Sequence, residues 1–252
     1  MVQRNEITTY LDLLLNVSAF DDYCPNGLQV EGRQEVNKII GGVTASQALI
    51  NEAILQGADT LLVHHGYFWK GEDPRVTGMK HKRLGSLLDA GINLLAYHLP
   101  LDAHPELGNN VQLARLLDLK VTGSFGKGAG PDIGLVGELP IRVTANAFAE
   151  HLATKLGREP LLIPGGQDPI HTIAWCTGAA QNYIEQAAAL GVDAFLTGEV
   201  SEQTVHEARE LGIHFFSAGH HATEKGGVMA LGAHLAENFD ITFHFADIDN
   251  PV

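Results

Sequence analysis

Histidines and carboxylates gather at three places in this chain, and their side chains could bind metal ions. The three groups are His64-His65, His98-x-x-x-Asp102 and His220-x-x-x-Glu224. Imidazole and carboxylate donors suit Zn, Mn, Fe or Ni, and the absence of a thiolate among them argues against a purely structural zinc site. The sequence therefore predicts a metal site, but these donors do not distinguish between the four metals.

Two ions suit this set of donors, because a carboxylate can bridge a pair of ions. Pairs roughly 3.5–4 Å apart are the usual arrangement in hydrolytic sites. Such a pair polarises a phosphoryl or carbonyl oxygen and generates hydroxide from water near neutral pH. We therefore expect two divalent ions per subunit, bound by His64, His65, Asp102, His220 and Glu224.

Each group of donors follows a predicted strand directly. The strands and the donors that follow them are Leu61–Val63 with His64-His65, Leu94–Tyr97 with His98, and Phe215–Gly219 with His220. In open α/β sheets, ligands bind beyond the carboxyl ends of the strands. This placement supports a shared site for all three groups.

His98 and Glu199 are the candidates for proton transfer, since neither is needed to complete the set of metal ligands. Each has an alternative role. His98 could orient Asp102 from outside the metal shell, and Glu199 could cap the helix that follows it. Pro100 disfavours a regular helix through Leu99, so we expect a loop that wraps a metal ion at this place.

Two stretches of the chain resemble each other at a constant offset of 134 residues. Eight of 28 positions are identical when Lys38–His65 is set over Thr172–Glu199. The identical residues of the first copy are Ile39, Ala45, Gln47, Ile50, Ala53, Gly57, Asp59 and Leu62. Self-similarity of this kind indicates a repeated structural unit. The alternative is a chance resemblance between two βαβ units, which share a composition.

Each copy alternates short apolar strands with amphipathic helices, a pattern typical of parallel sheets covered by helices. The predicted strands are Ile39–Val43, Leu61–Val63 and Ile92–Tyr97 in the first copy and Ile173–Cys176, Ala194–Thr197 and Ile213–Ser217 in the second. The second helix of each copy is expected at about Leu84–Ala90 and Val205–Leu211. We therefore expect an α/β protein of two related lobes with the metal site between them.

The predicted lobes comprise residues 1–122 and 132–252. Between them, residues 123–131 have the glycine-rich composition of a linker. The first lobe also carries an extra excursion, Tyr67–Lys80, that the second copy lacks.

Composition and charge limit the classes of partner. Lys and Arg number 16 against 30 for Asp and Glu, a net charge of −14 with His neutral. Such a surface repels phosphate backbones and anionic membranes, so neither nucleic acid nor membrane is expected as a partner. A small phosphorylated substrate is compatible if metal ions supply positive charge. Two cysteines and the lack of a signal segment favour a cytoplasmic location.

With these motifs the chain resembles the NIF-three-like family, known as GTP cyclohydrolase 1 type 2 homologues, and within it the short bacterial YbgI-like branch. The motifs are Asn26-Gly-Leu-Gln-Val30, His64-His65-Gly66, His98-Leu-Pro-Leu-Asp102, Thr197-Gly-Glu199 and Gly219-His-His-Ala-Thr-Glu224. They cover essentially the whole chain. The double histidine and the last motif are the specific ones.

The resemblance implies a dinuclear centre held by His64, His65, Asp102, His220 and Glu224. It also implies a two-lobed α/β fold and a ring-shaped homohexamer whose metals face an internal cavity. Longer relatives carry an inserted domain where this chain has only its glycine-rich segment, so functions tied to that insert do not transfer. The cyclohydrolase name is itself a homology label, and the family's substrate is poorly settled.

Two functions of different classes fit these observations. The favoured one is a metal-dependent hydrolase that acts on a small nucleotide-like or phosphorylated molecule. The alternative is a non-enzymatic metal carrier, metallochaperone or cofactor-handling protein, which predicts exchangeable metal and ligand binding without turnover. The sequence has no nucleophile elbow, Rossmann fingerprint or Walker motif to support another enzyme class.

Overall fold

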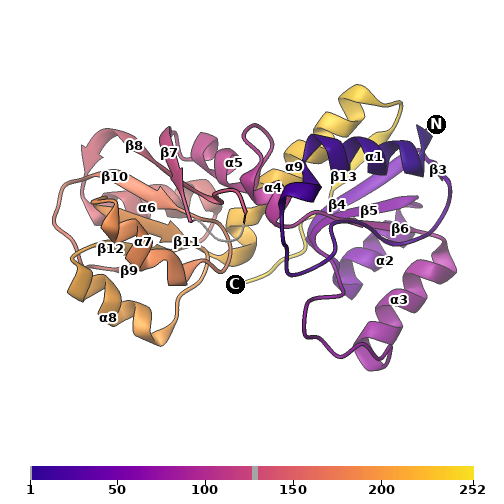
Figure 1. The fold of residues 1–252 in the computed structure, drawn as a ribbon, viewed down its shortest axis with the longest axis horizontal. Coiled ribbons are helices and arrows are strands. Elements are labelled where there is room, and N and C mark those ends of the chain that lie inside the picture. The colour runs from indigo at the N-terminus through magenta and orange to yellow at the C-terminus, as the bar shows by residue number, and fades with distance from the viewer. Residues whose placement is uncertain (1, 127–129) are drawn as a thin grey trace. The chain divides into compact units, whose positions relative to one another are not determined.

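The protein is described from a computed structural model that covers residues 2–126 and 130–252 (Figure 1). Its chain forms two compact units. The first consists of Met1–His104 and Gly227–Asp249, and the second consists of Pro105–Gly226 and Asn250–Val252. Each unit contains its own sheet and its own hydrophobic core.

A five-stranded sheet with the order β13-β4-β5-β6-β2 forms the centre of the first unit. Its strands are β2 (Gly27–Val30), β4 (Lys38–Thr44), β5 (Thr60–His65), β6 (Asn93–Ala96) and β13 (Thr242–Phe245). β13, β4, β5 and β6 are parallel, and β2 joins the edge antiparallel to β6. The short strands β1 (Val2–Gln3) and β3 (Glu35–Val36) pair separately.

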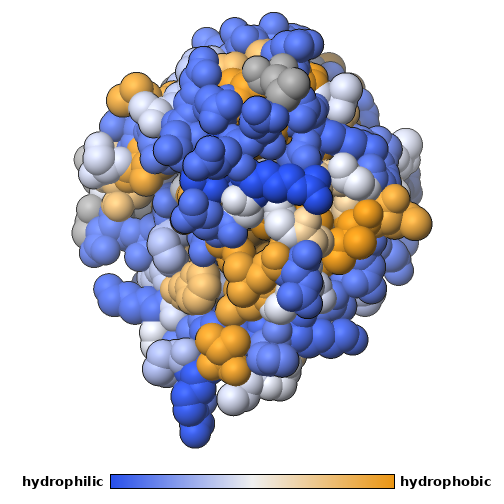
Figure 2. Space-filling model, turned by 90° about the vertical axis from the view of Figure 1, so that its right-hand side faces the viewer, coloured by the Kyte–Doolittle hydropathy of each residue, from blue (hydrophilic) through white to orange (hydrophobic). Residues whose placement is uncertain are grey.

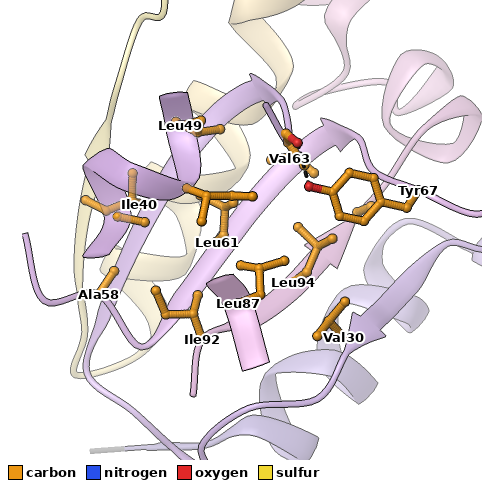
Figure 3. Close-up of a cluster of buried hydrophobic side chains, with 14 of the residues drawn as sticks. Val30, Ile40, Leu49, Ala58, Leu61, Val63, Tyr67, Leu87, Ile92 and Leu94 are labelled. Carbon is orange, nitrogen blue, oxygen red and sulfur yellow. Dashed lines mark hydrogen bonds between the residues drawn. The ribbon is translucent and has the colours of Figure 1, made fainter. Parts of the chain in front are cut away.

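Helices cover both faces of this sheet (Figure 1). The helices of the first unit are α1 (Arg4–Leu14), α2 (Gln47–Leu55), α3 (Gly78–Ala90) and α4 (Leu99–Ala103), with the 3-10 turn η1 (Val17–Ala19) after α1. Figure 3 shows the core on the side of α2 and α3, where Leu61 and Leu94 from the sheet pack with Leu49 and Leu87 from the helices. The Tyr67 hydroxyl donates a hydrogen bond of 2.6 Å to the carbonyl oxygen of Ala45 in this core.

A six-stranded sheet with the order β7-β8-β10-β11-β12-β9 forms the centre of the second unit. Its strands are β7 (Lys120–Phe125), β8 (Gly134–Val143), β9 (Leu161–Ile163), β10 (Ile170–Trp175), β11 (Ala194–Thr197) and β12 (His214–Ser217). β10, β11 and β12 are parallel, while β8 and β9 pair antiparallel with β10 and β12. The predicted parallel strands are thus confirmed in both units.

The helices of the second unit pack on its sheet around two buried clusters. They are α5 (Asn109–Leu116), α6 (Ala145–Leu156), η2 (Gln181–Tyr183), α7 (Ile184–Ala189) and α8 (Glu202–Leu211). The last helix, α9 (His220–Asn238), begins in the second unit, and the division between the units falls within it. One cluster contains Phe148 and Trp175, and the other contains Phe195 and Phe215.

Equivalent aspartates confirm that the two units are related. In the first unit, the carboxylate of Asp59 accepts hydrogen bonds of 2.9 and 3.0 Å from the backbone N–H groups of Asn37 and Lys38. In the second, the carboxylate of Asp193 accepts two bonds of 2.8 Å from His171 and Thr172. These partners match at the same sequence offset, and so does the register: Ile39 pairs with Thr60 as Ile173 pairs with Ala194.

The boundaries of the units differ from those expected from the sequence. β13 pairs with β4, so Thr242–Phe245 belongs to the first unit and not to a second lobe that runs to the end of the chain. The first part of the predicted linker, residues 123–125, lies in the edge strand β7, and residues 127–129 lie outside the described residues. These boundaries depend on which distant strands pair, and the local composition of the chain does not indicate that pairing.

The surface is consistent with the composition of the chain. Most of the face in Figure 2 is hydrophilic, and hydrophobic side chains are exposed in smaller areas of it. Among residues 2–126 and 130–252, no helix combines the length and the apolar character needed to span a bilayer.

Candidate metal centre

The first unit brings three histidines together at the carboxyl ends of β5 and β6. His64 and His65 are the last two residues of β5, and His98 follows β6 by two residues. One ring nitrogen of each lies within 4.8 Å of the others. His64 is fully buried, whereas His65 and His98 are half-buried. Such a group of ring nitrogens could hold a metal ion.

The contacts of His64 determine which of its nitrogens can bind a metal. His64 Nδ1 lies 2.8 Å from the carbonyl oxygen of Tyr97, which can only accept, so Nδ1 carries the proton. In the neutral ring Nε2 is then an acceptor, and it lies 3.4 Å from the Asp102 carboxylate oxygen Oδ1. A buried imidazole nitrogen and a buried carboxylate oxygen are the donor types that a divalent metal ion takes, so an ion could bind both of them.

His98 is held by a buried carboxylate that the sequence analysis missed. Asp22 Oδ1 lies 2.7 Å from His98 Nδ1, and the side chain of Asp22 is 3% exposed. Asp22 Oδ2 accepts from the N–H of Leu99 at 2.9 Å and from the amide of Asn26 at 2.8 Å. Asn26 in turn accepts from the backbone N–H of His98 at 2.7 Å. Asp22 therefore fixes the orientation of His98 and leaves Nε2 as its acceptor.

Asp22, Cys24 and His98 also come close enough together to hold an ion, but their chemistry does not suit one. Burial alone would raise the pKa of Asp22, yet hydrogen bonds from His98, Asn26 and Tyr23 outweigh it and hold the pKa below its ordinary value. Burial and the charge of Asp22 raise the pKa of the Cys24 thiol to about 12. A protonated thiol beside a carboxylate engaged in hydrogen bonds is a poor metal ligand.

The segment from His98 to Asp102 is helical, and the predicted loop is wrong. His98 is the N-cap residue of α4, and Pro100 lies in its first turn. Proline is tolerated there because the first N–H groups of a helix have no partner within the helix. The backbone N–H of Asp102 donates to the carbonyl oxygen of His98 at 3.1 Å, which places Asp102 one turn along. The side chain of His98 contacts Asp22 at 2.7 Å.

The second unit has a histidine and a carboxylate one turn apart at the start of α9. His220 Nε2 lies 3.1 Å from Glu224 Oε2, since residues four apart share one face of a helix. His220 Nδ1 lies 2.7 Å from Glu199 Oε1. Glu199 therefore contacts the histidine and does not cap α8, which begins with a capping box of Ser201 and Thr204. This geometry suits Glu199 to fixing the tautomer of His220.

Gly178 gives His220 and Glu224 the space that they occupy. Its φ is +70°, and an added Cβ would lie 2.1 Å from Glu224 Oε1 and 3.0 Å from His220 Nε2. The backbone N–H of Gly178 also donates to the hydroxyl of Thr223 at 3.1 Å, one residue before Glu224. Any larger residue here would displace the glutamate, so the close approach of this loop belongs to the site.

We predict that the metal-free protein loses stability as the pH rises from 6.5 to about 9. Burial lowers the pKa of His220, but Glu224 and Glu199 outweigh it and raise the pKa from 6.5 to about 9. A raised folded-state pKa adds stability that is fully present below pH 6.5 and disappears as the pH passes through about 9. The contribution is at most about 3 kcal/mol.

Thermal unfolding of chelator-treated protein between pH 6 and 10 measures this effect. The His220→Asn variant should lack the decline in this window, because its side chain does not titrate. An identical pH dependence in both proteins would contradict the prediction.

The structure places the predicted site residues in two groups, one in each unit. His64, His65, His98 and Asp102 lie at the sheet edge of the first unit, and His220, Glu224 and Glu199 lie together in the second. Asp22 and Gly178 were not predicted from the sequence. Asn26, which belongs to one of the family motifs, was the available signal for Asp22, since the two side chains are hydrogen-bonded.

A sequence model of one family, described as Duf34/NIF3 (NGG1p interacting factor 3), matches residues 2–251. The chain belongs to this family. The resemblance deduced from its motifs is thereby confirmed.

Several relatives match this chain over nearly their whole length. A GTP cyclohydrolase 1 type 2 homolog from Pseudomonas aeruginosa is 60% identical over 240 residues, which cover 95% of each chain. One from Escherichia coli K12 is 52% identical over 251 residues, 99% of this chain and 100% of the relative. The solved structure of protein YbgI, of unknown function, superposes with a TM-score of 0.96 at 52% identity and covers 100% of both chains.

Proposed function

We propose that this protein is a metal-dependent hydrolase with a dinuclear centre, and that its substrate is a small nucleotide-like or phosphorylated molecule. The observation that carries the proposal is the clustering of buried imidazole and carboxylate donors, with His64 Nε2 and the Asp102 carboxylate 3.4 Å apart. His65, His220 and Glu224 supply the remaining ligands for two divalent ions. Zn, Mn, Fe and Ni all suit this set of donors.

When bound, a pair of divalent ions would supply a Lewis acid and a water of lowered pKa. The residues of the chain have three tasks around it. The carbonyl of Tyr97 and the carboxylate of Glu199 hold His64 and His220 in the tautomers that leave Nε2 available. The buried Asp102 and Glu224 supply negative charge that compensates the cations. His98, oriented by Asp22, offers Nε2 as the proton acceptor for the reaction.

Metal analysis and a turnover assay test the proposal together. We expect two equivalents of metal per chain in the purified protein, and anomalous scattering from crystals should identify the element. The metal-loaded protein should hydrolyse at least one member of a panel of phosphoesters, nucleotides and amides. Exchangeable metal with stoichiometric ligand binding and no turnover would favour a metal carrier or cofactor-handling protein instead.

We also propose that the protein is a cytoplasmic homohexamer, as the family resemblance implies. Light scattering coupled to size-exclusion chromatography should give six times the chain mass of 27.1 kDa. A monomer or dimer at all concentrations would contradict this assembly.

A further inference from the structure

The first unit contains a segment that the proposed function has not used. In the second unit, four residues separate β11, which ends at Thr197, from α8, which begins at Glu202. In the first unit, the equivalent strand β5 ends at His65 and the next helix begins only at Gly78. The extra length follows the double histidine directly. It therefore starts at the candidate metal centre.

This segment places a tryptophan against two histidines of the centre. The ring centroid of Trp69 lies 5.0 Å from that of His98 in an edge-to-face arrangement at 84°. It lies 6.0 Å from the ring of His65. Trp69 is half-buried, whereas the other tryptophan, Trp175, is fully buried in the core of the second unit. Trp69 thus retains exposed ring surface beside the centre.

The backbone around Trp69 is held in an unusual conformation. Phe68 has a φ of 65°, in the left-handed region that bulky residues rarely adopt. Lys80 Nζ lies 5.1 Å from the centroid of the Phe68 ring and also pairs with Glu72. Strained residues of this kind persist only where surrounding contacts enforce them, and they concentrate at functional sites. The strain precedes Trp69 by one residue, so it determines where the indole lies.

A second loop supports the same position. The backbone N–H of Lys70 donates to the carbonyl oxygen of Tyr23 at 2.7 Å, which joins the segment to the loop that carries Asp22. The ring of Tyr23 also packs edge-to-face against the ring of His98, and the two ring centroids lie 6.4 Å apart. The tryptophan is therefore fixed before any ligand binds, which lowers the entropy cost of binding through it.

We propose that Trp69 binds the nucleobase of a nucleotide by ring stacking, beside metal ions that bind its phosphate. This inference rests on the proposed function and names the substrate class. An indole offers a large neutral ring face, and every nucleobase has a planar face that can stack on it. The chain's net charge of −14 disfavours phosphate elsewhere on the surface, so the phosphate needs the metal ions.

Titration of the metal-loaded full chain with guanosine monophosphate and with ribose 5-phosphate tests the inference. Calorimetry should show guanosine monophosphate binding about 5- to 150-fold more weakly to Trp69→Ala than to the wild type, the range expected for lost base stacking. Ribose 5-phosphate should bind both proteins equally. Trp69→Phe, which keeps a ring face, should retain most of the affinity. Guanosine monophosphate should also quench the tryptophan fluorescence of the wild type. It should not quench the fluorescence of Trp69→Phe, in which Trp175 is the only tryptophan.

Two results would overturn the inference. One is equal affinity of the wild type and Trp69→Ala for guanosine monophosphate, including no binding to either. The other is an equal loss of affinity for both probes, which would mean that Trp69 supports only the fold or the phosphate. Metal content, measured in both proteins, separates this test from the proposed function: a wild type without two equivalents of metal contradicts the dinuclear centre whatever Trp69 does.

Discussion

His64→Ala combined with His65→Ala is expected to reduce the metal content from two equivalents per chain to less than one. The two residues supply two of the five proposed ligands, and Asp102 loses the partner that lies 3.4 Å from its carboxylate. The remaining donors cannot restore the coordination number, because Asp102 is fixed in α4 and His220 and Glu224 are fixed in α9. Plasma emission spectrometry of the dialysed variant measures the loss. The secondary structure should persist, since the sheet around His64 is held by backbone pairing with both neighbouring strands.

Removal of two exposed imidazoles provides the matched control. His81→Ala with His206→Ala should keep both equivalents, because these side chains are exposed on α3 and α8. Removal of the fully buried His64 side chain leaves a cavity that could unfold the double variant. His65→Ala alone then tests the ligands in a folded protein, since His65 is only half-buried. Retention of both equivalents by the folded double variant would contradict the assigned ligands.

Asp22→Ala is expected to lower the turnover of the metal-loaded protein by about 100-fold or more, the usual contribution of a positioned proton acceptor, while the metal content stays at two equivalents. The ring of His98 loses the contact of 2.7 Å that fixes its tautomer and its direction toward His64 and His65. Initial rates on the substrate identified in the turnover panel measure the loss, and plasma emission spectrometry checks the metal content. Asp73→Ala serves as the control, because Asp73 is an exposed carboxylate that pairs only locally with Arg75.

A double-mutant cycle shows whether Asp22 acts through His98. In a His98→Ala background, Asp22→Ala should have no further effect on turnover, because the contact is already absent. Additive losses would mean that Asp22 supports the fold independently of His98. Unchanged turnover in His98→Ala would contradict its role as proton acceptor.

Much of the fold was predictable because the apolar patterns of the strands are local. The parallel strands of both copies were expected, and the duplication is confirmed by Asp59 and Asp193, which bind equivalent N–H groups. Helix α3 was expected to begin near Leu84 but begins at Gly78. Its first turns carry polar, mostly exposed side chains, so the apolar spacing that indicates a helix is absent there.

The sequence by itself determined the donor types, their place after strands and the family. Spacing along the chain carries this information, since His64 and His65 must follow a strand and Glu224 must lie one turn after His220 in a helix. The tertiary structure alone decided which groups orient these donors. Asp22 lies 76 residues from His98 and Glu199 lies 21 residues from His220, yet each accepts a hydrogen bond from its histidine. Such contacts depend on how loops meet at a sheet edge, and no local pattern encodes that meeting.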